Sequence, residues 1–168
     1  MSLLLSVIQY SVLNPFFVRV LAILIYLQPV APWSNTYADT AHAITDVTEE
    51  SSPLFAGPMG RERTIALLVS LAWFESHFNP EASGDNGMSH GLYQQQRFGE
   101  LRDPHEATVV ALRELRISFR ICRGHPASEG LGWYAAGGDG CENERGRRLS
   151  RHRYDKAVEI SFALIGAQ

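Results

Sequence analysis

Residues 64–80 read TIALLVSLAWFESHFNP, and this stretch decides the fold. Apolar side chains fall on every face of a helix over residues 64–78, which is typical of a helix buried at the centre of a domain. Asn79 and Pro80 end it, because the residue before a proline is pushed out of the α conformation. The sequence therefore predicts a compact domain packed around one central helix.

Further helical signals follow on the carboxyl side. Asp103 is suited to cap a helix, Pro104 to its first position, and Glu106 stands three residues after the cap. Helical spacing then gives one apolar stripe, formed by Leu112, Leu115, Phe119 and Cys122. A shorter helix is expected over residues 128–136 and a final one over residues 150–165, which is expected to bury Tyr154, Val158, Phe162 and Ile165. Because no stretch alternates apolar and polar residues as a long strand does, the predicted fold class is mainly α.

The chain has 168 residues, the size of one domain with a short appendage. Residues 1–38 are interpreted as a hydrophobic leader, in which Arg19 precedes a short apolar run and small residues stand near position 38. A cleaved signal peptide is favoured, an uncleaved anchor touching the membrane through residues 16–30 is the alternative, and a soluble segment is the third reading. Residues 39–56 have few large apolar side chains and are expected to be a linker. A catalytic domain over residues 57–168 would then work outside the cytoplasm, in the periplasm, the cell envelope, the extracellular space or a virion.

Cysteine and charge usage narrow the class of protein further. An even pair, Cys122 and Cys141, predicts one disulfide in an exported chain, and two buried thiols are the alternative. The net charge of -3 gives no reason to expect a nucleic-acid partner. Six histidines are scattered without metal-ligand spacing, so neither a metal nor a cofactor is expected. A monomer is the working expectation.

Glu75 is the residue that points to chemistry. It shares a helical face with Leu68, Leu71 and Ala72, where an unpaired carboxylate would be costly without a purpose. A carboxyl group that keeps its proton in such a place is suited to act as a general acid. The alternative is an ordinary surface residue at a helix end. Asp85 stands ten residues later in a glycine-bordered loop and is a candidate second carboxylate, or else a plain turn residue.

Three segments resemble, in order, the lysozyme-like lytic transglycosylases. Residues 75–80 (ESHFNP) resemble their E-S-x-F-N-P segment, and residues 91–94 (GLYQ) their G-L-x-Q segment. Residues 133–137 (WYAAG) are similar to their Y-N-A-G segment, with Ala135 where Asn is usual. The loop over residues 84–94 is also similar to goose-type lysozymes, although Gln95 and Gln96 stand where those enzymes tend to have another Asp. The resemblance covers about residues 61–160.

This resemblance implies a lysozyme-like helical fold and cleavage of the β-1,4 bond between N-acetylmuramic acid and N-acetylglucosamine in peptidoglycan. Glu75 would be the acid/base, and the saccharide would be bound by Ser76, Ser89, Gly91, Leu92, Gln94 and Tyr134. The serines are equally suited to bond local backbone, and Gly91 to a positive φ. In a transglycosylase Glu75 acts alone and an anhydro-sugar forms, whereas in a hydrolase Asp85 would activate water.

Two further hypotheses stay open. One is a non-catalytic saccharide-binding, envelope or virion assembly protein with the same fold, and the other is cleavage of a related polymer such as chitin.

Overall fold

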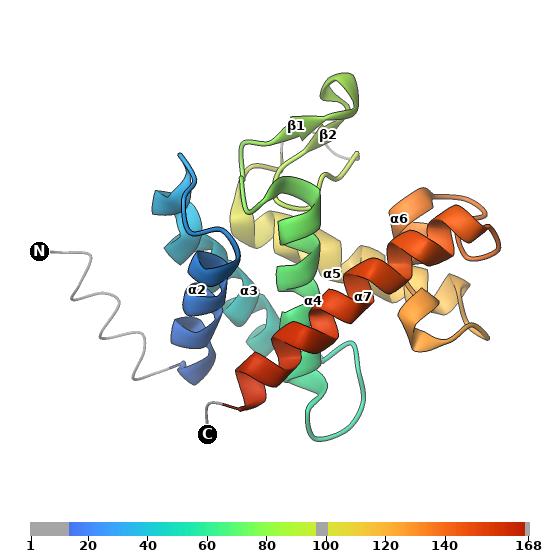
Figure 1. Cartoon of the computed structure of the whole chain (residues 1–168), viewed down its shortest axis with the longest axis horizontal. Coiled ribbons are helices and arrows are strands. Elements are labelled where there is room, and N and C mark those ends of the chain that lie inside the picture. Colours follow the sequence, from blue (N-terminus) through green and yellow to red (C-terminus); the bar gives the residue numbers. More distant parts are fainter. Residues whose placement is uncertain (1–13, 97–100, 167–168) are drawn as a thin grey trace, which may run out of the picture.

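The computed structural model describes residues 14–96 and 101–166, and its architecture confirms the mainly α class (Figure 1). The helices are α2 (Pro15–Leu27), α3 (Tyr37–Glu50), α4 (Gly60–Ser76), α5 (Pro104–Ile121), α6 (Gly132–Ala136) and α7 (Glu144–Ile165). Three short 3-10 turns join them: η1 (Ser34–Thr36), η2 (Asp85–Gly87) and η3 (Ala127–Glu129). The described strands, β1 (Ser83–Gly84) and β2 (Ser89–His90), pair antiparallel beyond the carboxyl end of α4.

Helix α4 is the predicted central helix. Every residue from Thr64 to Ala72 is buried, and α7 crosses it with the most extensive contact between any two described elements. The helix ends at Ser76, two residues earlier than expected. His77 and Phe78 then take the left-handed conformation, with φ of 53° and 64°, which turns the chain sharply into the following loop.

Helix α5 begins as the sequence predicts. Asp103 Oδ1 accepts a hydrogen bond of 2.8 Å from the amide of Glu106, and Pro104 occupies the first turn. In the predicted stripe Leu112, Leu115 and Cys122 are buried, and Phe119 is partly buried. The helix expected over residues 128–136 is divided into η3 and α6.

The buried face predicted for the last helix is wrong in part. Helix α7 starts earlier, after the cap Asn143, and buries Ala157, Ile160, Ser161 and Leu164. Val158 is 39% and Phe162 69% exposed. Ser70 of α4 donates a 2.7 Å hydrogen bond to the carbonyl of Arg153, so the two helices are in direct contact there. The buried face of α7 is therefore set by its contact with α4, which lies far away in the sequence.

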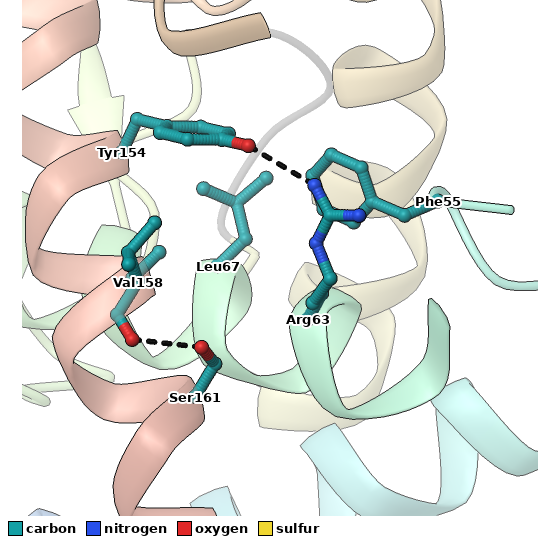
Figure 2. A pocket seen from close by; sticks show the side chains of 7 residues that line it. Phe55, Arg63, Leu67, Tyr154, Val158 and Ser161 are labelled. Carbon is teal, nitrogen blue, oxygen red and sulfur yellow. Dashed lines mark hydrogen bonds between the residues drawn. The ribbon is translucent and has the colours of Figure 1, made fainter. Parts of the chain in front are cut away.

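The side of α7 next to this face closes a small hollow against α4 (Figure 2). Tyr154, predicted to be buried, is partly buried there, and its hydroxyl accepts a 3.1 Å hydrogen bond from Arg63. The Arg63 guanidinium lies 4.4 Å from the ring centroid of Phe55. The hollow measures about 20 Å³, which is room for one water molecule.

The segment predicted to be a linker is helical over most of its length. Residues 39–50 belong to helix α3 rather than to a linker, and α3 buries Ala41, Ile44 and Val47 against the core. Thr45 and Thr48 are buried as well, because their hydroxyls donate to carbonyls one turn back at 2.8 Å. A composition of Ala and Thr looks too polar for a core, yet in this helix the hydroxyls of Thr45 and Thr48 are satisfied by carbonyls of the same helix.

Helix α2 joins the same core. Phe17, Val20 and Leu24 are fully buried, and Arg19 donates a 2.7 Å hydrogen bond to the carbonyl of Leu164 in α7. Residues 15–38 are thus packed with the domain that was expected to begin at residue 57, while residues 1–13 of the expected leader lie outside the described residues. Within the described ranges, no helix combines the length and the apolarity that crossing a membrane requires.

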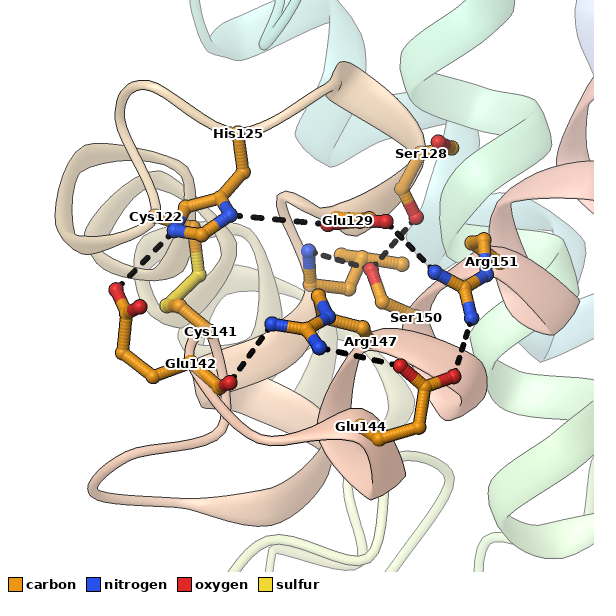
Figure 3. Close-up of polar contacts among 11 residues, drawn as sticks. Cys122, His125, Ser128, Glu129, Cys141, Glu142, Glu144, Arg147, Ser150 and Arg151 are labelled. Carbon is orange, nitrogen blue, oxygen red and sulfur yellow. Dashed lines mark hydrogen bonds and ion pairs between the residues drawn. A yellow bond between two sulfur atoms is a disulfide. The ribbon is translucent and has the colours of Figure 1, made fainter.

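The predicted disulfide joins Cys122, after α5, to Cys141, before α7 (Figure 3). Ion pairs surround it: His125 lies 3.1 Å from Glu142, and Arg151 lies 2.7 Å from Glu129. A disulfide indicates an oxidising, non-cytoplasmic environment.

Candidate active site

A groove of about 670 Å³ runs past the end of α4. Its walls come from the last turn of α4, the loop carrying η2, the segment after β2, helix α5 and helix α6 with the turn that follows. Its lining includes Glu75, Asp85, Gln94 and Tyr134, which the sequence analysis nominated from three separate segments. The volume lies in the range of about 300–1,000 Å³ that is usual for ligand-binding clefts.

Glu75 has a partner that its position in the sequence did not disclose. Arg153 of α7 contacts Glu75 Oε1 through both Nε, at 2.9 Å, and Nη2, at 2.8 Å. The side chains are 18% (Glu75) and 12% (Arg153) exposed, so the carboxylate is neither unpaired nor an ordinary surface group. Both contacts fall on Oε1, and no hydrogen bond to Oε2 is found among the described residues. One carboxyl oxygen is thus held in place by Arg153, and the other has no such contact among the described residues.

The end of α4 is tied to the groove loop by Ser76. Its hydroxyl lies 3.0 Å from the carbonyl oxygen of Ala72 and 2.8 Å from that of Leu92. The indole of Trp33 donates a 2.9 Å hydrogen bond to the carbonyl of His77, and Phe78 is fully buried beyond it. Ser76 is buried and does not line the groove, so it positions the helix end that carries Glu75 instead of facing a saccharide.

Asp85 is an exposed carboxylate at the groove. Ser89 donates a 2.5 Å hydrogen bond and Gln96 a 3.2 Å hydrogen bond to its Oδ2. These bonds stabilise the anion, and they lower the pKa of Asp85 below its ordinary value. Ser89 itself is buried, so it holds Asp85 and is placed behind the groove surface.

The segment that follows β2 mixes structural and groove-lining residues. Gly91 has φ of 74°, and a Cβ there would lie 2.1 Å from the carbonyl oxygen of Leu101, so glycine is required for the close approach. Leu92 is fully buried in the core. Gln94 lines the groove, with its Nε2 donating to the Gly91 carbonyl at 3.1 Å. Of the predicted binding residues here, Gln94 alone reaches the groove.

Tyr134 stands on α6 in the groove wall. Its hydroxyl donates to the carbonyl of Tyr93 at 3.1 Å, and its amide donates to Ser118 Oγ at 3.1 Å. Burial raises the pKa of Tyr134 well above its ordinary value, and the negative charges of Glu75 and Glu114 raise it further. The phenol is therefore neutral, and it presents an aromatic wall in the groove.

Arg153, Glu114 and Gln95 are three of the groove or site residues that were not nominated from the sequence. Arg153 lies in the last predicted helix and was assigned no role from the sequence. Glu114 of α5 lines the groove and shares a helical face with Ala111 and Ser118, three and four residues away. Gln95 was noted as a departure from a family pattern and given no role. A search of the described residues finds no cluster of three or more His, Cys, Asp or Glu side chains arranged to hold a metal ion.

Compared with models of protein families, with curated proteins and with solved structures, the chain matches none of them. The chemistry of the groove must therefore carry the functional argument.

Proposed function

We propose that this protein is a peptidoglycan-cleaving lytic transglycosylase with Glu75 as its general acid/base. The observation that carries the proposal is the state of this carboxyl group: it ends the central buried helix, faces a saccharide-sized groove, and is held at Oε1 while Oε2 has no hydrogen bond among the described residues.

The reaction assigns one task to each half of the cycle. Protonated Oε2 donates its proton to the glycosidic oxygen, and the bond between that oxygen and the anomeric carbon breaks. The ionised Oε2 then accepts the proton of the C6 hydroxyl of the same sugar as O6 bonds to the anomeric carbon. A 1,6-anhydro ring forms, no water is consumed, and Glu75 regains its proton.

Arg153 positions this carboxyl group. By bonding Oε1 twice, it prevents the side chain from rotating away from the groove.

Hydrolysis is the alternative outcome in the same groove. Asp85 supports it, because Ser89 and Gln96 hold this carboxylate ionised, as a general base must be. A second candidate function is a non-catalytic saccharide-binding, envelope or virion assembly protein, and the Glu75–Arg153 ion pair is the observation that favours it.

The disulfide suits an exported protein, and peptidoglycan lies in the compartments to which such proteins are sent. We assign the protein on this basis to the periplasm, cell envelope or extracellular space, or to a virion.

Digestion of purified peptidoglycan by the full chain, with mass spectrometry of the products, tests the proposal. Wild type should release anhydro-ended fragments, and Glu75→Gln should lower the rate by about 10²- to 10⁴-fold. Glu159→Gln is the matched control, because Glu159 is an exposed carboxylate outside the groove.

Reducing ends in place of anhydro ends, lost in Asp85→Asn, would establish the hydrolase. A folded wild type that releases no fragment from peptidoglycan or chitin would overturn the catalytic proposal and favour the binding protein.

A further inference from the structure

Helix α2 has a second face that the core does not use. Its inner side is buried, whereas the helix itself lies at the outer edge of the molecule with α3 on its other side (Figure 1). The residues exposed on the outer side are apolar or aromatic and follow one another at helical spacing. This outer face of α2 consists of Pro15, Val18, Ala22, Ile25 and Tyr26, continued by Pro29 and Val30 after the helix.

The outer face of α2 carries no charge. Residues 1–38 contain a single charged side chain, Arg19. Arg19 donates a hydrogen bond to the carbonyl of Leu164 in α7, so it belongs to the inner side of the helix. A contiguous exposed apolar patch of this kind marks a contact site for another protein or for a membrane.

The outer face of α2 is too small to hold a stable dimer. Helix α2 has 13 residues, so the face measures about 20 Å by about 10 Å. Each partner in a stable protein complex buries about 800 Å², which is several times more. A fluid bilayer sets no such requirement, because it adapts to the shape of the helix and its binding strength scales with the apolar area that it covers.

Two features around the outer face of α2 suit a lipid surface. Tyr26, near the carboxyl end of the helix, is 81% exposed, and tyrosine is enriched where membranes meet water because its ring is apolar and its hydroxyl polar. Residues 1–13 end directly before the cap Asn14, are rich in Leu, Ile and Val, and contain no charged side chain. The uncharged sequence therefore extends from residue 1 to the start of α2.

We propose that the outer face of α2 docks on a lipid bilayer and holds the domain at the membrane surface. Because the inner side of α2 is part of the core, the helix lies parallel to the membrane, with its outer side chains at the boundary between headgroups and acyl chains. The groove is held in the same rigid body, since Trp33 after α2 donates a hydrogen bond to the carbonyl of His77 at the end of α4. This inference is independent of the proposed reaction.

Flotation of the full chain with phosphatidylcholine vesicles tests the docking. Wild type should float with the vesicles, and raising NaCl from about 0.1 M to about 0.5 M should change the bound fraction by less than about twofold, because salt does not screen an uncharged face. The double variant Val18→Glu/Ile25→Glu should bind at least about tenfold more weakly, because it places charge in the apolar boundary.

The chain offers a closely matched control on α5. Val109→Glu/Ile121→Glu replaces side chains that are 47% and 49% exposed, against 44% for Val18 and 50% for Ile25, and it should leave vesicle binding unchanged. Both double variants should unfold at the wild-type temperature, because every replaced side chain is exposed.

A fluorescence measurement separates the outer face of α2 from residues 1–13. Tyr26→Trp places an indole on the face, and brominated phosphatidylcholine should quench this variant more strongly than wild type. Val109→Trp should show no additional quenching. This readout keeps the proposal testable if a glutamate variant does not fold.

The remaining outcomes overturn the proposal. Wild type that does not float excludes docking on lipid, and a wild-type dimer that Val18→Glu/Ile25→Glu dissociates would then assign the outer face to a second copy. Flotation that the α2 double variant does not weaken, with no additional quenching of Tyr26→Trp, would assign membrane binding to residues 1–13 alone. Digestion of purified peptidoglycan needs no membrane, so its result stands separately from this one.

Discussion

Leu24 and Ile25 are neighbours on α2, and they test whether this helix belongs to the domain. Leu24 is fully buried and Ile25 is 50% exposed. Leu24→Ala should lower the free energy of unfolding by about 3 kcal/mol. Truncating a buried leucine costs about 2–5 kcal/mol, and we take a value in the lower half of that range because α2 lies at the edge of the core. Ile25→Ala makes the same kind of truncation on the exposed face and should stay within about 0.5 kcal/mol of wild type.

Urea unfolding followed by circular dichroism measures both free energies, and a thermal scan provides a check. For a chain of this size, about 3 kcal/mol should lower the melting temperature by about 6–12 °C. The reasoning is refuted if Leu24→Ala and Ile25→Ala agree within about 0.5 kcal/mol. Residues 15–27 would then contribute nothing to the core, and a separable leader would be the correct description.

Replacing both Cys122 and Cys141 by serine should lower the free energy of unfolding by about 3 kcal/mol, because the disulfide joins residues 19 positions apart and restricts the unfolded chain. Thermal unfolding of the variant beside the oxidised wild type measures this loss. Gly91→Ala should destabilise by about 2–4 kcal/mol through its positive φ and the clash with the Leu101 carbonyl, whereas Gly87→Ala, with positive φ but open space, should cost about 1 kcal/mol in urea unfolding. Ser89→Ala should raise the pKa of Asp85 toward its ordinary 3.8, as read by NMR titration of the carboxyl carbon. Because the pKa of Asp85 is lower in the folded than in the unfolded protein, its ionised carboxylate stabilises the fold above pH 3.8. That stabilisation is lost as the pH falls through the folded-state pKa, so wild type and Ser89→Ala should become equally stable in stronger acid.

Local patterns were sufficient for the elements whose signals lie within one segment. The run around α4 is apolar on all sides, and the cap of α5 is encoded by Asp103 and Pro104. Local patterns did not predict α3, because they do not show that Thr45 and Thr48 can be buried once their hydroxyls bond to carbonyls of their own helix.

The mainly α class and the central helix that ends near Glu75 could be predicted from the sequence alone. The two cysteines allowed at most one intramolecular pairing, and the structure confirms that the disulfide forms. Only the tertiary structure shows which face of α7 is buried and that Arg153 reaches Glu75 across 78 residues of sequence. It also encloses the Gln95 side-chain amide, which has no hydrogen-bond partner among the described residues. The physical reason is the range of the forces involved. Helix periods and caps depend on neighbours within one or two turns, whereas an ion pair or a buried amide depends on which distant surfaces come into contact when the core closes.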